Sequence, residues 1–232
     1  LVNAFFAIQK TLAISCVLFS TLGEEAIYDR MENCQAKVLI TKKSLLKKVL
    51  TVKPQLPELR YILLVDGEKD EADDILSLPA RTAVAPAEFD YPHFVDPETP
   101  SFLQYTSGST GKPKGALHVH GALADMLNSF SEVMQPEPED IYWCTADPAW
   151  ITGLVYGIIV PFAAGIRQVQ FEGTYRADRW LAILAQQQVS LWYTAPTALR
   201  MLMQEEIEWD SIELPHLKRI YSVGEPLNPE IY

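Results

Sequence analysis

Residues 102–115 read FLQYTSGSTGKPKG, and this stretch carries the strongest structural signal in the chain. Its first four residues predict a buried strand, and a helical pattern follows at residues 121–133. Between them, three glycines let backbone amides approach an anion, four Ser and Thr hydroxyls add donors, and two lysines add positive charge. A strand, a loop and a helix form a context in which proteins bind phosphates. The stretch therefore predicts a polyphosphate site in an α/β fold.

The loop differs from a Walker A loop, which needs Gly five residues before its Gly-Lys pair and Ser or Thr after it. Thr106 and Pro113 occupy those two positions. A flexible linker rich in Ser and Gly is the alternative interpretation, but a linker has no need of Lys112 and Lys114. We therefore expect a phosphate cradle of another kind.

Short apolar runs alternate with amphipathic helical patterns along most of the chain. Helices are predicted at residues 23–33 and 177–187, and from Pro196 onward, where Pro is tolerated in the first turn. Strands are predicted at residues 13–19, 38–40, 61–65, 102–105, 141–144, 169–171, 190–193 and 219–223. This alternation predicts an α/β fold with a mainly parallel sheet and helices on both faces.

Three segments need separate interpretation. Residues 68–100 hold five prolines and a cluster of acids, which predicts a surface excursion. Residues 148–166 carry no charge and are almost long enough to cross a bilayer, but their glycines and internal Pro161 favour a tightly packed buried helix. Residues 11–22 have the length of a signal segment but no basic start beyond Lys10, so we expect a core strand.

Composition limits the classes of function. The 232 residues are 48% hydrophobic, which is enough for one large domain or two small ones. Asp and Glu outnumber Lys and Arg by 30 to 19, and the net charge of −11 argues against nucleic acid as a partner. Cys16, Cys34 and Cys144 form no CxxC pair, so we expect neither a zinc module nor a disulfide scaffold, and a reducing, cytoplasmic compartment. His118 and His120 are expected to frame the loop rather than to bind a metal.

The string YTSGSTGKPKG at residues 105–115 resembles the phosphate-binding signature of the adenylate-forming superfamily, which includes acyl-CoA synthetases, luciferases and the adenylation domains of peptide synthetases. Three more strings narrow the resemblance: TADPAWITG at 145–153, YTAPTALR at 193–200 and SVGEPLNPE at 222–230. Together they resemble the AMP-forming acetyl-CoA synthetase branch, the acetate–CoA ligases. The resemblance implies the N-terminal large-domain portion of the adenylate-forming fold.

The resemblance also implies roles for individual residues. The loop would hold the β and γ phosphates of ATP, with catalytic roles for Thr106 and Lys114. The turn of Gly224, Glu225 and Pro226 would pack along adenine. Trp150, Ile151 and Thr152 would line the carboxylate pocket, and Thr152 would also meet CoA. The loop residues implied to bind ATP are Thr106, Ser107, Gly108, Ser109, Thr110, Gly111, Lys112 and Lys114.

The implied reaction has two steps. A carboxylate attacks the α-phosphorus of ATP to give an acyl adenylate and pyrophosphate, and the thiol of CoA then displaces AMP. ATP and CoA are the implied co-substrates, with Mg²⁺ as a bridging cation and no site built from protein metal ligands. No enzyme nucleophile is required, so Ser107 and Ser109 are not assigned that role. Small molecules are the expected partners, with no membrane.

Residues 1–232 would then be a partial AMP-binding (adenylation) domain that lacks the C-terminal small domain and is inactive alone. Two other interpretations stay open. One is a nucleotide-binding remnant or interaction module without turnover. The other is a medium-chain acyl-CoA ligase, although the Gly-Glu-Pro turn and the Trp-Ile-Thr-Gly string favour the acetate branch.

Overall fold

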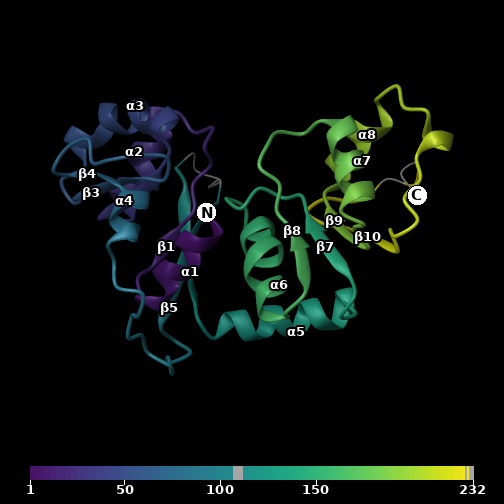
Figure 1. The fold of residues 1–232 in the computed structure, drawn as a ribbon, viewed down its shortest axis with the longest axis horizontal. Coiled ribbons are helices and arrows are strands. Elements are labelled where there is room, and N and C mark those ends of the chain that lie inside the picture. Colours follow the sequence, from purple (N-terminus) through teal and green to yellow (C-terminus); the bar gives the residue numbers. More distant parts are fainter. Residues whose placement is uncertain (107–111, 228, 230–232) are drawn as a thin grey trace. The chain divides into compact units, whose positions relative to one another are not determined.

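The computed structural model describes residues 1–106, 112–227 and 229, and the chain divides into two compact units (Figure 1). The first unit is Leu1–His120 and the second is Gly121–Tyr232. Within the described ranges, no helix is both long enough and apolar enough to cross a membrane.

One sheet of the first unit has the strand order β1-β5-β6. β1 (Ser15–Cys16) runs parallel to β5 (Pro100–Thr106), and β6 (Lys114–Val119) runs antiparallel to it. Phe102 of β5 is fully buried, stacks on the His118 ring and meets Phe5 of α1 (Val2–Lys10) edge-on.

The strand predicted at residues 13–19 is wrong in extent. Only Ser15 and Cys16 pair with β5, whereas Leu18 packs against a different hydrophobic core. Ala13 and Ile14 are exposed, so the apolar run marks a strand at only two of its seven residues.

The second sheet of this unit consists of the parallel strands β2 (Val38–Thr41), β3 (Tyr61–Leu64) and β4 (Ile75–Ser77). Two amphipathic helices, α2 (Glu24–Asn33) and α3 (Lys43–Val52), bury their apolar stripes with it. A short 3-10 turn, η1 (Lys53–Gln55), follows α3. The buried residues of this core are Met31, Val49, Val52, Leu56, Leu59, Ile62 and Leu64.

The surface excursion expected at residues 68–100 needs correction, because β4 and α4 (Leu78–Ala83) lie inside it. Ser77 is fully buried, donates to the Gly67 carbonyl oxygen over 2.6 Å and accepts from Ala80 N–H over 3.0 Å, which caps α4. Pro79 stands in the first turn of this helix, where its missing N–H costs nothing. Residues 84–99 contain no helix or strand and are mostly exposed.

The second unit contains a four-stranded, fully parallel sheet with the order β10-β9-β7-β8. Its strands are β7 (Ile141–Cys144), β8 (Arg167–Val169), β9 (Leu191–Thr194) and β10 (Arg219–Ser222). Its other elements are α5 (Ala122–Met134), η2 (Thr152–Ile159), α6 (Val160–Ala163), α7 (Ala177–Gln186), α8 (Pro196–Met203) and η3 (Trp209–Ser211).

Two neighbouring residues of β7 show how helices cover both faces of this sheet. Successive side chains of a strand point to opposite faces. Tyr142 meets Phe130 of α5 with ring centroids 5.4 Å apart, while Trp143 meets Trp180 of α7 at 5.5 Å. Both aromatic residues of β7 are almost fully buried. The prediction of a mainly parallel sheet with helices on both faces is confirmed.

The uncharged segment at residues 148–166 is a buried helix, as predicted, but much of it is wound as a π-helix, η2. Gly157 allows this helix to approach β7, since a side chain there would meet Cys144 at 3.3 Å. π-helical turns occur often at functional sites.

Asp140 joins the amino ends of three neighbouring strands. It directly precedes β7 and accepts hydrogen bonds from Ser190 Oγ over 2.7 Å and Lys218 Nζ over 2.9 Å, which precede β9 and β10. Its other oxygen accepts from Glu137 N–H over 2.9 Å. Burial alone would raise the pKa of Asp140, but these hydrogen bonds outweigh burial and lower the pKa.

Candidate functional site

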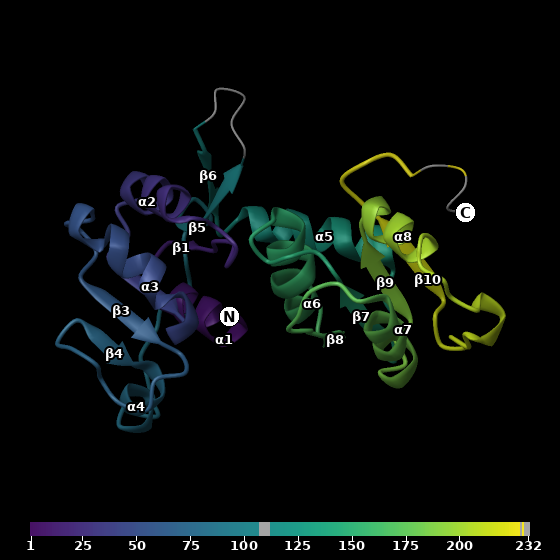
Figure 2. The ribbon, with the colours of Figure 1, turned by 90° about the horizontal axis from the view of Figure 1, so that it is seen from above.

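The loop singled out in the sequence lies in the chain between β5 and β6, two strands of the first unit that pair antiparallel. Thr106 ends β5 and pairs with Lys114, which begins β6, and the Thr106 hydroxyl donates to the Lys114 carbonyl oxygen over 3.4 Å. Thr106, Lys112 and Lys114 are all exposed. The hairpin can be followed in Figure 2. The predicted ligand-binding residues Ser107, Gly108, Ser109, Thr110 and Gly111 lie outside the described residues.

The strand–loop–helix context predicted for this loop is wrong. The chain continues into β6, and α5 begins only at Ala122, after that strand. β6 was missed because its residues are largely exposed and show no clear alternation of apolar and polar side chains. An anion at this loop would therefore meet backbone amides, hydroxyls and lysines of a hairpin, without a helix N-terminus immediately following.

The other three motif strings converge at one edge of the sheet in the second unit. β7, β9 and β10 are adjacent and parallel, with Cys144 opposite Tyr193 and Thr194 opposite Ser222. Residues 145–153, 195–200 and 223–226 therefore all leave the sheet at its carboxyl edge, the edge at which ligands bind in open α/β sheets.

Two threonines tie neighbouring strands together at this edge. The Thr145 hydroxyl donates to Thr194 Oγ1 over 2.6 Å, and Thr145 N–H donates to the Tyr193 carbonyl oxygen over 3.0 Å. The Val223 N–H donates to the Thr194 carbonyl oxygen over 3.1 Å. Thr194 thus contacts the beginnings of both flanking motif strings.

A tight turn places the residues predicted for the carboxylate pocket. The Asp147 side chain accepts from Ala149 N–H over 2.8 Å, and its carbonyl oxygen accepts from Trp150 N–H over 2.9 Å. This is the turn role expected for an Asp before Pro. A Cβ on Gly153 would overlap the Asp147 carbonyl group, so only Gly fits there.

The pocket residues themselves differ in exposure. Trp150 is 54% exposed, while Ile151 and Thr152 are half-buried at the beginning of η2. The structure brings these three residues together on one turn at the carboxyl edge, which gives a large aromatic surface, a branched apolar side chain and one hydroxyl.

The predicted adenine turn is anchored to α8. Gly224 has a φ of +92°, a conformation that favours glycine. Glu225 accepts hydrogen bonds from the Thr197 N–H over 3.2 Å and from the Thr197 hydroxyl, and it forms an ion pair with Arg200. The Thr197 hydrogen bonds, followed by Arg200, lower the pKa of Glu225. Pro226 follows and is exposed.

Thr197 and Arg200 were not among the predicted site residues. Both belong to the string YTAPTALR, and Arg200 also donates to Thr197 Oγ1 over 2.8 Å. Thr197 and Arg200 are three residues apart, which places them on the same side of a helix. This spacing is the feature of the sequence that could have predicted their contact. Their shared contact with Glu225 becomes visible only in the folded chain.

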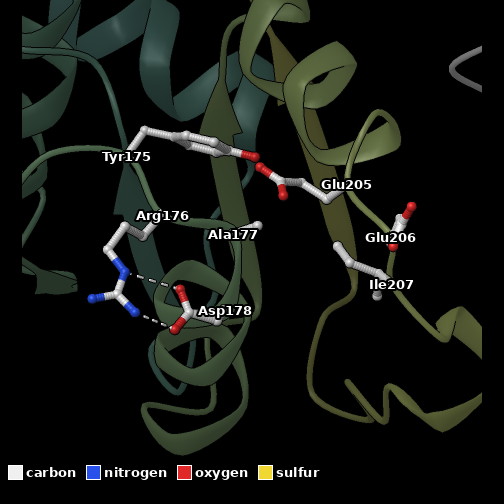
Figure 3. Close-up of a pocket in the computed structure, with 7 residues that line it drawn as sticks. All are labelled: Tyr175, Arg176, Ala177, Asp178, Glu205, Glu206 and Ile207. Atoms are coloured by element: carbon white, nitrogen blue, oxygen red, sulfur yellow. Dashed lines mark hydrogen bonds and ion pairs between the residues drawn. The ribbon is translucent and has the colours of Figure 1, made fainter.

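A separate hollow of about 430 Å³ opens between the start of α7 and the segment after α8 (Figure 3). It contains none of the predicted site residues. Arg176 pairs with Asp178 on its rim, and the Tyr175 hydroxyl points toward Glu205. Burial, followed by the charge of Glu205, raises the pKa of Tyr175. The wall is lined by Tyr175, Arg176, Ala177, Asp178, Glu205, Glu206 and Ile207.

A parallel sheet with helices on both faces and three motif strings at its carboxyl edge places the chain in the class of α/β proteins. The chain belongs to the family of AMP-binding enzymes, which matches residues 1–232. The fold is that of adenylate-forming acyl-CoA ligases and covers their N-terminal portion.

Two similar proteins of known name are acetyl-coenzyme A synthetases. The chain is 40% identical over 223 residues to the acetyl-coenzyme A synthetase of Bacillus subtilis, covering 96% of this chain and 38% of the relative. It is 35% identical to the acetyl-coenzyme A synthetase of Drosophila melanogaster, covering 99% of this chain and 39% of the relative. The chain thus spans well under half the length of these relatives.

Two solved structures share the fold. An acyl-CoA synthetase of Brucella canis is 25% identical, with a TM-score of 0.89 over 99% of this chain and 41% of that chain. An anthranilate CoA ligase in complex with anthranoyl-AMP is 24% identical, with a TM-score of 0.91 over 99% of this chain and 44% of that chain.

Proposed function

We propose that this chain is the part of an AMP-forming acetate–CoA ligase that binds ATP and a short carboxylate. The observation that carries the proposal is the convergence of three motif strings at the carboxyl edge of one parallel sheet. The identity to acetyl-coenzyme A synthetases over nearly the whole chain supports acetate as the acid.

In this proposal, ATP is held by two groups of residues. The turn of Gly224, Glu225 and Pro226 packs along adenine, with Glu225 fixed by Thr197 and Arg200. The hairpin loop, from Thr106 to Lys114, holds the β and γ phosphates through its amides, hydroxyls and lysines. Thr106 and Lys114 serve catalysis because positive charge and donors there stabilise the departing pyrophosphate.

The carboxylate pocket is formed by the turn before η2. Trp150 and Ile151 limit the length of the acyl chain, and the Thr152 hydroxyl offers a polar partner to the carboxylate and later to CoA. The substrate carboxylate is itself the nucleophile that attacks the α-phosphorus, so no protein nucleophile takes part. Holding the two groups in line supplies most of the lowering of the activation barrier in the first step.

Mg²⁺ fits this site as a partner of the phosphates. Among the described residues, no group of three or more His, Cys, Asp and Glu side chains could hold a metal ion. Mg²⁺ commonly binds through substrate phosphates and only one or two protein oxygens, and Thr106 offers an exposed hydroxyl at the base of the loop. When bound, the ion neutralises charge on the phosphates.

Calorimetry with two unreactive mimics of the adenylate, the ethyl and octyl esters of AMP, tests the nucleotide and acyl sites together. We expect the 232-residue chain to bind ATP and to bind the ethyl ester more tightly than the octyl ester. A preference for the octyl ester would favour the medium-chain alternative. Absence of binding by ATP and both esters, in a chain shown to be folded by circular dichroism, would overturn the proposal.

A further inference from the structure

Two cysteines that are distant in sequence meet in the first unit. Cys16 lies in β1, opposite Leu103 of β5, and Cys34 directly follows α2, whose end meets Tyr105 of the same β5. The two thiols are near enough for each to shift the pKa of the other. Both are free and half-buried. We propose that Cys16 and Cys34 are a redox site, in which a small disulfide such as glutathione disulfide converts the two thiols reversibly into a disulfide bond.

The two thiols belong to a cluster that joins three elements. The Tyr105 hydroxyl of β5 donates to the Asn33 Oδ1 atom over 2.7 Å and to the Arg30 carbonyl oxygen over 3.0 Å, and the Cys34 thiol next to Asn33 donates to the Met31 carbonyl oxygen over 3.7 Å. The Arg30 guanidinium lies 5.7 Å from the centre of the Tyr105 ring. Because Tyr105 directly precedes Thr106, the cluster lies at the base of the hairpin that carries the predicted phosphate loop.

The surroundings give the two thiols different chemistry. The hydrogen bond from Cys16 outweighs burial and, with a hydrogen bond from Tyr105, lowers the pKa of Cys34 to about 7. The same hydrogen bond and burial raise the pKa of Cys16, against a smaller opposing effect of Arg30. A thiolate is the nucleophile in disulfide exchange, so Cys34 is the attacking residue and Cys16 the resolving one.

The exchange balances in two steps. The Cys34 thiolate attacks one sulfur of glutathione disulfide, forms a mixed disulfide and releases a glutathione thiolate. The Cys16 thiol gives its proton to that thiolate, attacks the Cys34 sulfur and releases the second glutathione thiolate, which takes a proton from solvent. The two protein thiols are oxidised to one disulfide, and one glutathione disulfide is reduced to two molecules of glutathione.

Cys144 of β7 provides an internal control in the same chain. It lies in the other unit, and burial raises its pKa to about 11. At neutral pH it carries far less thiolate than Cys34, so it should exchange much more slowly.

The test incubates the folded chain with glutathione disulfide at pH 7.5 and maps its disulfides by mass spectrometry of peptides prepared at acid pH. We expect a peptide linked through Cys16 and Cys34, and its loss after dithiothreitol. Cys16→Ser should instead accumulate glutathione on Cys34, because the resolving thiol is gone. Cys34→Ser should leave Cys16 largely unmodified.

Alkylation by iodoacetamide supplies a readout that does not depend on variants. The rate at Cys34 should rise through about pH 7, ahead of Cys144. The charged and titratable groups around Cys34 are Cys16 of β1, Arg30 of α2 and Tyr105 of β5. Equal rates at Cys34 and Cys144 in the folded chain, or no linked peptide with glutathione disulfide, would overturn the proposal. The result is independent of the proposed ligase activity.

Discussion

Arg200 of α8 forms an ion pair with Glu225, the central residue of the turn that follows β10. The same carboxylate accepts the Thr197 N–H in the first turn of α8, where a negative charge is favourable. The helix after β9 and the turn after β10 are therefore held together across the carboxyl edge of the sheet.

Arg200→Ala should weaken binding of AMP to the chain several-fold, because the Gly224–Pro226 turn loses one of its two anchors on α8. Calorimetric titration of AMP measures the change. Arg176→Ala is the matched control, since Arg176 also pairs with an acid, Asp178, but lies outside the motif strings. An unchanged AMP affinity in Arg200→Ala would contradict the positioning role.

Lys114→Ala should act mainly on the first half-reaction. In the polypeptide that carries this chain, we expect formation of acetyl adenylate to slow on the order of a hundredfold, because a charge that stabilises the departing pyrophosphate is removed. The thioester step from supplied acetyl adenylate should be unchanged. Lys47→Ala, at an exposed position of α3, is the control. Equal slowing of both half-reactions would argue against this role.

Gly153→Ala should disturb the turn that carries Trp150 and Thr152. The new Cβ would overlap the Asp147 carbonyl group, and we expect a loss of unfolding free energy of about 1–3 kcal/mol. Urea unfolding measures it. Gly23→Ala is the control, because nothing lies within 4 Å of a Cβ there. Equal stability of the two variants would show that the turn accommodates the methyl group.

Acid should destabilise the second unit through Asp140. Its pKa is lower in the folded chain than in the unfolded chain, so its contribution to stability is complete at neutral pH. That contribution is lost as the pH falls through the ordinary Asp range, about 3.9, toward the lower folded pKa. We expect Asp140→Asn to lower the melting temperature at pH 7. In this variant the melting temperature should also fall less steeply as the pH is lowered. Asp90→Asn, in the exposed segment, should do neither.

The sequence predicted the buried parts of the fold better than its edges. β7 and β9 are short apolar runs buried on both faces, which periodicity detects. β4 and α4 were missed because Pro79 signals a break in the sequence, whereas in the structure it stands in the first turn of a helix that begins at Leu78. β6 was missed because exposed residues carry no apolar pattern.

The candidate site shows the same division. Glu225 and Trp150 were predicted as site residues because both belong to the motif strings on which the resemblance rests. Thr197 and Arg200 escaped notice because their contacts with Glu225 join segments 28 and 25 residues apart. The contact of Cys16 with Cys34 was likewise hidden, because only the pairing of β1 with β5 brings β1 beside the end of α2.

The central claim is that the polypeptide carrying this chain activates acetate on ATP. Exchange of labelled pyrophosphate into ATP, measured with and without acetate and with propionate and octanoate in parallel, tests it most directly. We predict exchange that requires acetate and is weaker with octanoate. No exchange with any of these acids, by a folded polypeptide that binds ATP, would contradict the ligase account and favour a nucleotide-binding protein without turnover.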